Sequence, residues 1–322
     1  MEKQKKPKII VTRAIPPSVA DALSEKFSVT LNLSDIPFSK NELKDAFKNS
    51  DGILCTVSDQ ITSDIINSKG RRASIISNYG VGVSNIDITE CKKVGLTVTN
   101  TPNVLTDATA EVALFLILAV SRRTTFLEAK LRQYKWKGFS IVDDLGASLD
   151  GKILGIIGMG RIGQATARKV INSLGMKVVF FNRSTIKELE FEARQIKSLD
   201  DVLKCSDIVS VHAPGGGLEP ILTKKHFSMM KKSAFLINTA RGDVIDQHAL
   251  IEALKNGIIA GAGLDVYLDE PKVPNELMSL DNVTLLPHIG SATLETREAM
   301  GMLAVNNLKA HFSDKNYPSK VV

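Results

Sequence analysis

The chain has 322 residues, 43% of them hydrophobic, and 41 basic residues against 35 acidic ones give a net charge of +6. This length and hydrophobic content allow a sizeable buried core and predict two domains. The positive charge is modest and dispersed, which argues against a nucleic-acid-binding protein. The lysines at the start of the chain are interpreted as a short solvated tail: Lys3, Lys5, Lys6 and Lys8.

Membrane and metal sites are also not expected. No apolar segment of signal-peptide type follows the lysine tail, and the longest apolar run, Val112–Val120, is too short to cross a bilayer. Cys55, Cys91 and Cys205 lie far apart without C-x-x-C spacing, which favours a reduced, cytoplasmic protein over a disulfide scaffold or a zinc site. No cluster of histidine, cysteine and carboxylate side chains has the spacing of metal ligands.

The first hundred residues alternate between short apolar runs and helix-like segments. Strands are predicted at Ile9–Thr12, Val29–Leu31, Gly52–Thr56, Ser74–Ser77 and Thr97–Thr99, and helices at Pro17–Lys26 and Lys40–Phe47. This alternation is typical of an α/β domain. A long helix, Asn103–Arg123, is then predicted as a rigid link between domains. The more polar stretch Thr124–Asp150, with the only tryptophan, Trp136, is interpreted as an arm.

The segment Lys152–Ser184 has the pattern of a βαβ unit that binds a dinucleotide. After the strand Ile153–Ile157, three glycines follow at G-x-G-x-x-G spacing: Gly158, Gly160 and Gly163. In this motif the glycines allow a tight turn, a close approach to the pyrophosphate, and close packing of helix on strand. The phosphates would bind at the N-terminus of the helix that begins near Arg161.

The end of the second strand, Val178–Phe181, predicts which nucleotide binds. A carboxylate for the adenosine 2′-hydroxyl is expected about nineteen residues after the last glycine, but the residues there are Asn182, Arg183 and Ser184. A carboxylate would repel a 2′-phosphate, whereas Arg183 can pair with it through two hydrogen bonds. The sequence therefore predicts NADPH in preference to NADH.

Further strands are predicted at Asp207–Val211, Ala234–Asn238, Ile259–Val266 and Val283–Leu286, and a helix that follows Ser291 is expected to fold back on the N-terminal domain. The last three strands lead to Arg241, Glu270 and His288. Because ligands of open α/β sheets bind beyond the carboxyl ends of the strands, these side chains could converge at one site. Histidine suits proton donation to a developing alkoxide, glutamate can orient the ring, and arginine can bind the carboxylate of a 2-oxo acid.

Four blocks, in order, resemble the signatures of the D-isomer-specific 2-hydroxyacid dehydrogenases. They are Gly158-Met-Gly-Arg-Ile-Gly163, Asn238-Thr-Ala-Arg-Gly242, Leu264-Asp-Val with Asp269-Glu-Pro271, and Leu286-Pro-His-Ile-Gly290. The resemblance implies an α/β fold of two doubly wound parallel-sheet domains. A Rossmann cofactor domain, residues 102–290, would be inserted in a flavodoxin-like substrate domain, residues 1–101 plus 291–322. It also implies that Arg241, Glu270 and His288 are catalytic, with His288 as the acid and base.

Within that family, Asn100–Asp107 and the Asn182–Thr185 stretch look most like glyoxylate/hydroxypyruvate reductases. That likeness implies that the backbone of Val81 and Gly82 binds the substrate carboxylate. Trp136 would either reach the partner's active site in a homodimer or only pack at the dimer interface. The remaining cofactor contacts that it implies are Thr106, Arg161, Ile162, His212, Pro214, Thr239, Arg241, Asp265, His288 and Gly290.

These features together predict a cytoplasmic, homodimeric oxidoreductase that uses NADPH to reduce glyoxylate to glycolate and hydroxypyruvate to D-glycerate. One alternative is a related dehydrogenase of a bulkier 2-oxo acid such as 2-ketogluconate. Another is a dinucleotide-sensing protein of the corepressor type. Two departures from the family pattern bear on this: the form of Tyr79–Gly82 leaves the substrate size open, and Gly215–Leu218 replaces a polar turn on the adenosine side.

Overall fold

A computed structural model describes residues 6–313 and 315–322, so Lys3 and Lys5 of the predicted tail lie outside the described residues. The chain divides into two compact units. One comprises residues Met1–Leu105 and Ser291–Val322, and the other comprises Thr106–Gly290. Within the described residues, no helix combines the length and the apolar character needed to cross a membrane.

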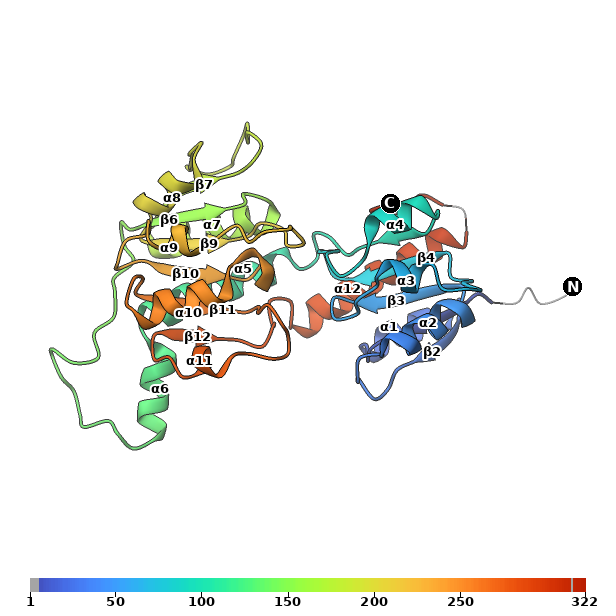
Figure 1. The fold of residues 1–322 in the computed structure, drawn as a ribbon, viewed down its shortest axis with the longest axis horizontal. Coiled ribbons are helices and arrows are strands. Elements are labelled where there is room, and N and C mark those ends of the chain that lie inside the picture. Colours follow the sequence, from blue (N-terminus) through green and yellow to red (C-terminus); the bar gives the residue numbers. More distant parts are fainter. Residues whose placement is uncertain (1–5, 314) are drawn as a thin grey trace, which may run out of the picture. The chain divides into compact units, whose positions relative to one another are not determined.

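The first unit is built on a parallel five-stranded sheet in the order β2-β1-β3-β4-β5, the flavodoxin-like order (Figure 1). Its strands are β1 Lys8–Val11, β2 Ser28–Leu31, β3 Gly52–Thr56, β4 Ile75–Tyr79 and β5 Thr97–Thr99. Its helices are α1 Pro17–Ser24, α2 Lys40–Asn49, α3 Ser63–Ile66, α4 Ile88–Lys93 and α12 Leu294–His311. The predicted strands are confirmed to within about two residues at their ends.

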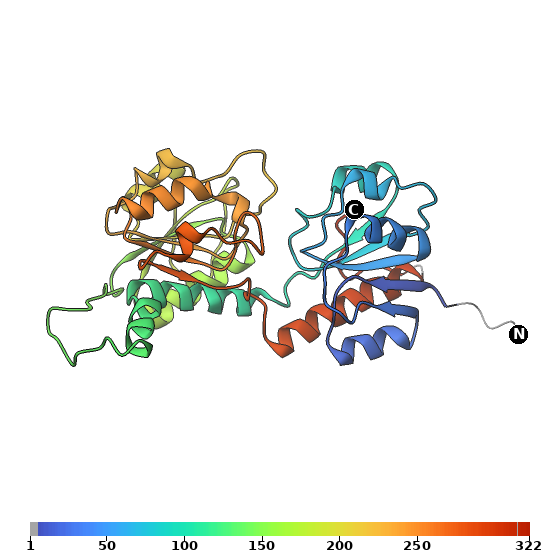
Figure 2. The same ribbon diagram turned by 60° about the horizontal axis from the view of Figure 1, so that its bottom comes forward.

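Alternating side chains of this sheet face two helix layers, which explains why the inner strands β1, β3 and β4 are buried almost along their whole length. Ile53 and Ile76 pack with α2 and α3, whereas Ser77 on the opposite face donates to the carbonyl of Ala304 in α12 at 3.1 Å. Figure 2 shows α12 running beneath this sheet beside α1, with which it is in contact. The C-terminal helix therefore belongs to the N-terminal unit, as the sequence predicts.

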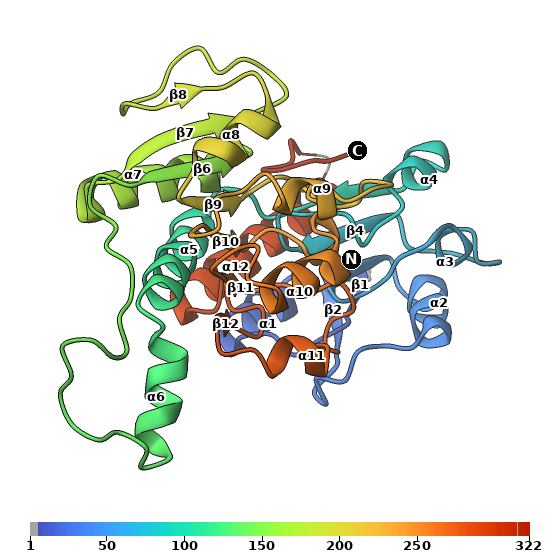
Figure 3. The same cartoon turned by 60° about the vertical axis from the view of Figure 1, so that its left-hand side comes forward.

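The second unit contains a parallel seven-stranded sheet in the order β12-β11-β10-β9-β6-β7-β8, which Figure 3 shows from bottom to top. The strands are β6 Ile153–Ile157, β7 Lys177–Phe181, β8 Arg194–Gln195, β9 Ile208–Val211, β10 Phe235–Asn238, β11 Gly261–Leu264 and β12 Val283–Leu285. The order changes direction at β6, so a crevice is expected at the carboxyl ends of β6 and β9. The α/β class with two doubly wound parallel sheets is confirmed.

Helices cover both faces of the second sheet. They are α5 Thr106–Ser121, α6 Thr124–Arg132, α7 Arg161–Leu174, α8 Leu199–Cys205, α9 Lys224–Phe227, the 3-10 turn η1 Gly242–Val244, α10 Gln247–Lys255 and α11 Asn275–Met278. Ile156 and Ile237 pack with α5 and α7, while Val209 and Leu236 pack with α9 and α10. This two-sided burial holds the strand ends rigidly in place.

The predicted long helix and arm differ from the structure at their boundaries. The helix begins at Thr106 rather than Asn103, because Asn103 has φ 73°, and it ends at Ser121 ahead of Arg123, which has φ 55°. Left-handed residues cannot continue a right-handed helix. The segment predicted as an arm begins with α6, which has no buried residue and so lacks the apolar period that identifies helices from sequence.

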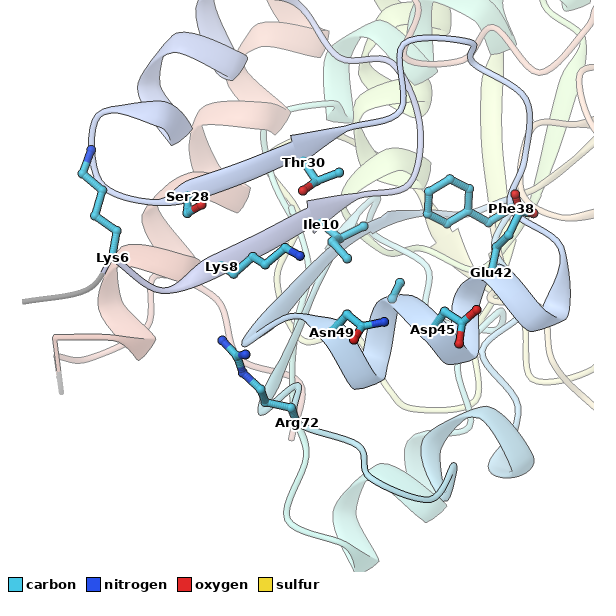
Figure 4. A pocket seen from close by; sticks show the side chains of 11 residues that line it. Lys6, Lys8, Ile10, Ser28, Thr30, Phe38, Glu42, Asp45, Asn49 and Arg72 are labelled. Carbon is cyan, nitrogen blue, oxygen red and sulfur yellow. The ribbon is translucent and has the colours of Figure 1, made fainter.

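An open groove of about 740 Å³ lies on the first unit, between α2 and the β1–β2 edge of the sheet (Figure 4). Lys8 and Arg72 lie toward one end and Glu42 toward the other. Arg72 is already held by Asp51 through two hydrogen bonds of 2.6 Å. The groove arises because α2 leaves the edge strand uncovered, and it lies away from the carboxyl ends of the strands.

Candidate active site

The turn after β6 has the geometry that a dinucleotide requires. Gly158 has φ 95°, and a Cβ placed there would lie 2.8 Å from the backbone nitrogen of Ala213. A Cβ at Gly163 would lie 2.4 Å from the carbonyl oxygen of Gly158, so this glycine lets α7 pack closely on the turn. A Cβ at Gly160 would meet nothing within 4 Å. The open space beside Gly160 and the N-terminus of α7 at Arg161 suit a pyrophosphate.

A cavity of about 520 Å³ adjoins this turn at the carboxyl ends of β6 and β7. Its lining includes Gly158, Asn182, Arg183, Ser184 and Pro214, all predicted to bind the cofactor. Asn182 folds the turn by donating to the carbonyl oxygen and the hydroxyl of Ser184, both at 3.0 Å. Arg183 therefore lines the cavity from a turn that is held by hydrogen bonds.

Two groups that shape this cavity were not predicted from the sequence. The side-chain amide of Gln195, on β8, donates to the carbonyl oxygen of Ser184 at 3.0 Å and anchors the turn. Asp243, which belongs to η1, lines the same cavity as Arg183. The two-residue strand β8 has no detectable periodicity. Asp243 had only one sequence signal, its place two residues after Arg241.

Arg241 follows β10 and is held in a tight backbone turn. Its carbonyl oxygen accepts a hydrogen bond of 2.8 Å from the Asn238 side chain, and its Nη1 donates to the carbonyl of Ala240 at 2.6 Å. Burial lowers the pKa of Arg241, while the charges of Glu270 and Asp243 act in the opposite direction. An arginine with these carboxylates nearby stays a cation, suited to binding a substrate carboxylate.

Glu270 and His288 form a hydrogen-bonded pair. The Nδ1 of His288 lies 2.7 Å from Oε2 of Glu270, and the backbone N–H of Tyr267 donates to Oε1 at 3.0 Å. Burial raises the pKa of Glu270, but the hydrogen bond and charge of His288 and the charge of Arg241 outweigh it, so the net pKa is lowered. An ionised Glu270 keeps the hydrogen on Nδ1, which leaves Nε2 of His288 to face a substrate.

The backbone around His288 is clamped by Asp265. His288 has φ 55°, a conformation that is uncommon for a residue with a side chain and is often found at functional sites. The carboxylate of Asp265 accepts hydrogen bonds from the backbone N–H groups of Ile289 at 2.7 Å and Gly290 at 2.8 Å. Although these donors lower it, burial raises the pKa of Asp265 overall.

Arg241, Glu270 and His288 are thus brought together within one unit. Strands β10, β11 and β12 are neighbours in the sheet, and each of the three residues follows one of them (Figure 1). His288 is hydrogen-bonded to Glu270, and the charge of Arg241 is among the influences that lower the pKa of Glu270. The unit thus holds a partly buried guanidinium together with an imidazole that is hydrogen-bonded to a carboxylate.

Other residues of the predicted cofactor and substrate sites lie in the same unit. His212 follows β9, its Nε2 lies 2.9 Å from the hydroxyl of Ser210, and burial lowers its pKa to about 4. It is therefore a neutral ring at physiological pH. Thr239 is buried, and within the described residues its hydroxyl has no hydrogen-bond partner. Thr106 is the first residue of α5, and Trp136, on the arm, is 60% exposed.

Val81 and Gly82 lie in the first unit, in the loop after β4. The side chain of Asn100 donates to the carbonyl oxygen of Val81 at 2.9 Å, and the side chain of Asn78 donates to that of Gly82 at 2.9 Å. Their own backbone N–H groups form no hydrogen bond with any part of the chain that the structure describes. The loop is therefore prepared to donate hydrogen bonds to an acceptor.

Comparison with known proteins places this geometry in context. The sequence model of one domain family, the NAD binding domain of the D-isomer specific 2-hydroxyacid dehydrogenases, matches residues 114–290 of this chain. A glyoxylate reductase of Thermococcus litoralis is 41% identical over 323 residues, covering 98% of this chain and 97% of that protein. A glyoxylate reductase of Thermofilum pendens is also 41% identical, covering 98% and 94%.

A solved structure agrees with these relatives. The NADPH-dependent glyoxylate/hydroxypyruvate reductase of Sinorhizobium meliloti, in complex with NADP and malonate, is 33% identical to this chain. It superimposes with a TM-score of 0.88 and covers 99% of this chain and 97% of that one. The likeness therefore extends over both units and is not confined to the cofactor domain.

Proposed function

Because this chain belongs to the D-isomer-specific 2-hydroxyacid dehydrogenases, we propose that it reduces small 2-oxo acids, glyoxylate to glycolate and hydroxypyruvate to D-glycerate. The observation that carries the proposal is the pairing of His288 with Glu270 beside Arg241, in the unit that also holds the dinucleotide turn. The similar proteins are glyoxylate reductases and a glyoxylate/hydroxypyruvate reductase, which supports the same substrate class.

The roles of the residues follow from their chemistry. A bound reduced nicotinamide supplies a hydride to the carbonyl carbon of the substrate. Arg241 binds the adjacent carboxylate and polarises the carbonyl. His288 donates a proton from Nε2 to the carbonyl oxygen as it gains negative charge, and Glu270 stabilises the imidazolium from which that proton comes.

The prediction that the Val81 and Gly82 amides bind the substrate carboxylate remains part of this proposal. It is supported by the side chains of Asn100 and Asn78, which donate hydrogen bonds to the carbonyl oxygens of Val81 and Gly82. The backbone N–H groups of Val81 and Gly82 remain as donors for a ligand. The Sinorhizobium relative was solved with malonate, a dicarboxylate. A carboxylate is an acceptor that free backbone amides can bind.

We also propose that NADPH is preferred to NADH, through Arg183. In Arg183→Ala, kcat/KM with NADPH is expected to fall by roughly 10- to 100-fold, the effect of losing a charge-assisted pair, while kcat/KM with NADH changes little. Steady-state kinetics with both cofactors measures this. The matched control is Arg168→Ala, which removes a surface arginine of α7 that pairs with Glu190. An equal or higher kcat/KM of the unmodified enzyme with NADH would refute the preference.

The arm supports the proposal of a homodimer. Large apolar side chains are highly exposed along it, including Tyr134 at 96%, Phe139 at 90% and Ile141 at 80%. So many exposed apolar side chains on one short segment are typical of a surface that a partner covers. We expect a dimer in light scattering, and a shift toward monomer in the double variant Phe139→Asp/Ile141→Asp. Leu33→Asp, at a residue of the first unit that is 82% exposed, should leave the mass unchanged. A monomeric unmodified protein would contradict the proposal.

A cytoplasmic location is proposed on the state of the cysteines. Cys55, Cys91 and Cys205 are all unpaired thiols, and burial raises the pKa of Cys55 and Cys91. Buried, protonated thiols of this kind are typical of proteins in a reducing compartment.

A further inference from the structure

The glycine-rich loop that follows His212-Ala213-Pro214 is held by a single carboxylate. The backbone N–H of Gly216 donates to Oδ2 of Asp243 at 2.6 Å. Gly216 has φ 84°, a conformation that directs this N–H toward the carboxylate and suits glycine. Asp243 belongs to η1, directly after Arg241 and Gly242. The contact therefore links the loop after β9 to the turn that carries Arg241.

The same contact explains why residue 215 has no side chain. A Cβ at Gly215 would lie 2.3 Å from Oδ1 of Asp243, 2.8 Å from Cβ of Arg241 and 2.9 Å from Cγ of Arg241. Real Cβ atoms essentially never approach other atoms so closely, so an alanine there would push the loop away. A Cβ at Gly217, by contrast, would meet only the carbonyl oxygen of Glu219, at 3.4 Å, which is an ordinary contact.

One oxygen of the Asp243 carboxylate is enclosed by this packing. Its Oδ1 is buried and has no hydrogen-bond partner among the residues that the structure describes. A buried carboxylate oxygen without a donor is costly unless a positive charge lies nearby. Arg241 provides that charge, since Asp243 is one of the two carboxylates whose field acts on the Arg241 guanidinium. Asp243 is thus stabilised by the positive charge of Arg241, and it accepts a hydrogen bond from the backbone N–H of Gly216.

This linkage forms one wall of the cavity beside the dinucleotide turn. The lining of that cavity includes Asp243, Gly215, Gly216 and Arg183, which follows β7. We propose that Asp243 is a positioning residue: it latches the loop of Gly215 and Gly216 against the stem of Arg241 and so sets the shape of the site for the adenosine end of the cofactor. The inference rests on the proposed function, in which this cavity accepts that end of a nicotinamide dinucleotide.

The latch differs from Arg183 in what it affects. Arg183 carries a charge that distinguishes a 2′-phosphate from a 2′-hydroxyl, whereas the latch shapes a wall that both cofactors would meet. Loss of the latch is therefore expected to raise the Kd for NADPH and the Kd for NADH by a similar factor. The ratio of the two Kd values should stay unchanged. Loss of Arg183 changes the ratio.

The test is a comparison of two alanine substitutions in the same loop, with Kd for NADPH and NADH measured by calorimetric titration of the full-length protein. Gly215→Ala is expected to raise both Kd values about tenfold, and Gly217→Ala at least five times less. Asp243→Ala should resemble Gly215→Ala, whereas Asp243→Asn keeps an acceptor for the Gly216 N–H and should retain most of the affinity. In the Asp243→Ala background, adding Gly215→Ala should cost less than it does alone, because one of its clashes is gone.

Several results would overturn the latch. Equal effects of Gly215→Ala and Gly217→Ala would do so, as would unchanged Kd values in both Gly215→Ala and Asp243→Ala. A lowered melting temperature with unchanged Kd values would show a merely structural role. If Gly215→Ala does not fold, Asp243→Ala and Asp243→Asn are compared instead. Equal Kd values in these two variants would then refute the latch. An unmodified protein that binds neither nucleotide would refute the cofactor site itself, and one that prefers NADH would refute only the role of Arg183.

Discussion

His288→Ala is expected to lower kcat for glyoxylate reduction by about 10²- to 10⁴-fold, the range measured for loss of a general acid. The reason is geometric: Glu270 holds Nδ1 at 2.7 Å, so Nε2 is the atom that remains to protonate the substrate oxygen. The Kd for NADPH should change far less than kcat. Stopped-flow and steady-state measurements of NADPH oxidation, together with a binding titration, separate the two quantities.

The control for His288 is His248→Ala, which removes an exposed histidine of α10 and should leave kcat within about twofold, as for most surface substitutions. Glu270→Gln keeps the shape of the partner but removes its charge, so it should lower kcat by less than loss of the ring does. A His288→Ala enzyme with a kcat near that of the unmodified protein would exclude His288 as the proton donor.

Arg241→Ala is expected to lower kcat/KM for glyoxylate by about 10³-fold, through a higher KM and a lower kcat together. A bidentate arginine holds a carboxylate in the ground state and also polarises the carbonyl in the transition state, so its loss affects both constants. Arg241→Lys keeps the charge but not the two parallel donors, and should recover only part of the loss. Kinetics over a range of glyoxylate concentrations at saturating NADPH measures both constants.

Arg168→Ala, which removes a surface arginine of α7 that pairs with Glu190, is the matched control for Arg241. Because Arg241 also packs against Gly215, the Kd for NADPH must be measured in each Arg241 variant. An unchanged kcat/KM in Arg241→Ala would rule out the carboxylate clamp.

The strand ends could be predicted from the sequence because they depend on a simple rule. Three apolar runs each lead into one polar side chain, and parallel strands place their carboxyl ends at one edge, so Arg241, Glu270 and His288 had to lie near one another if the strands were neighbours. The neighbour order itself, β10-β11-β12, came from the structure. The glycine turn was predictable for a related reason, since each glycine answers a local steric requirement.

The features that could not be predicted depend on contacts through space. Asp243 has no motif of its own, and its contact with Gly216 joins residues 27 positions apart. The helix α6 buries none of its side chains, so its apolar residues follow no inward-facing period. The left-handed backbone of His288 is imposed by hydrogen bonds from Ile289 and Gly290 to Asp265, which no sequence period reveals.

The most direct test of the proposed function follows the absorbance of NADPH when glyoxylate is added to the purified full-length protein, with glycolate measured in parallel. The structure predicts that NADPH is consumed and glycolate formed in equal amounts by the unmodified protein, and that His288→Ala binds NADPH without consuming it at a comparable rate. A protein that binds NADPH yet consumes none with glyoxylate or hydroxypyruvate would contradict the proposed function.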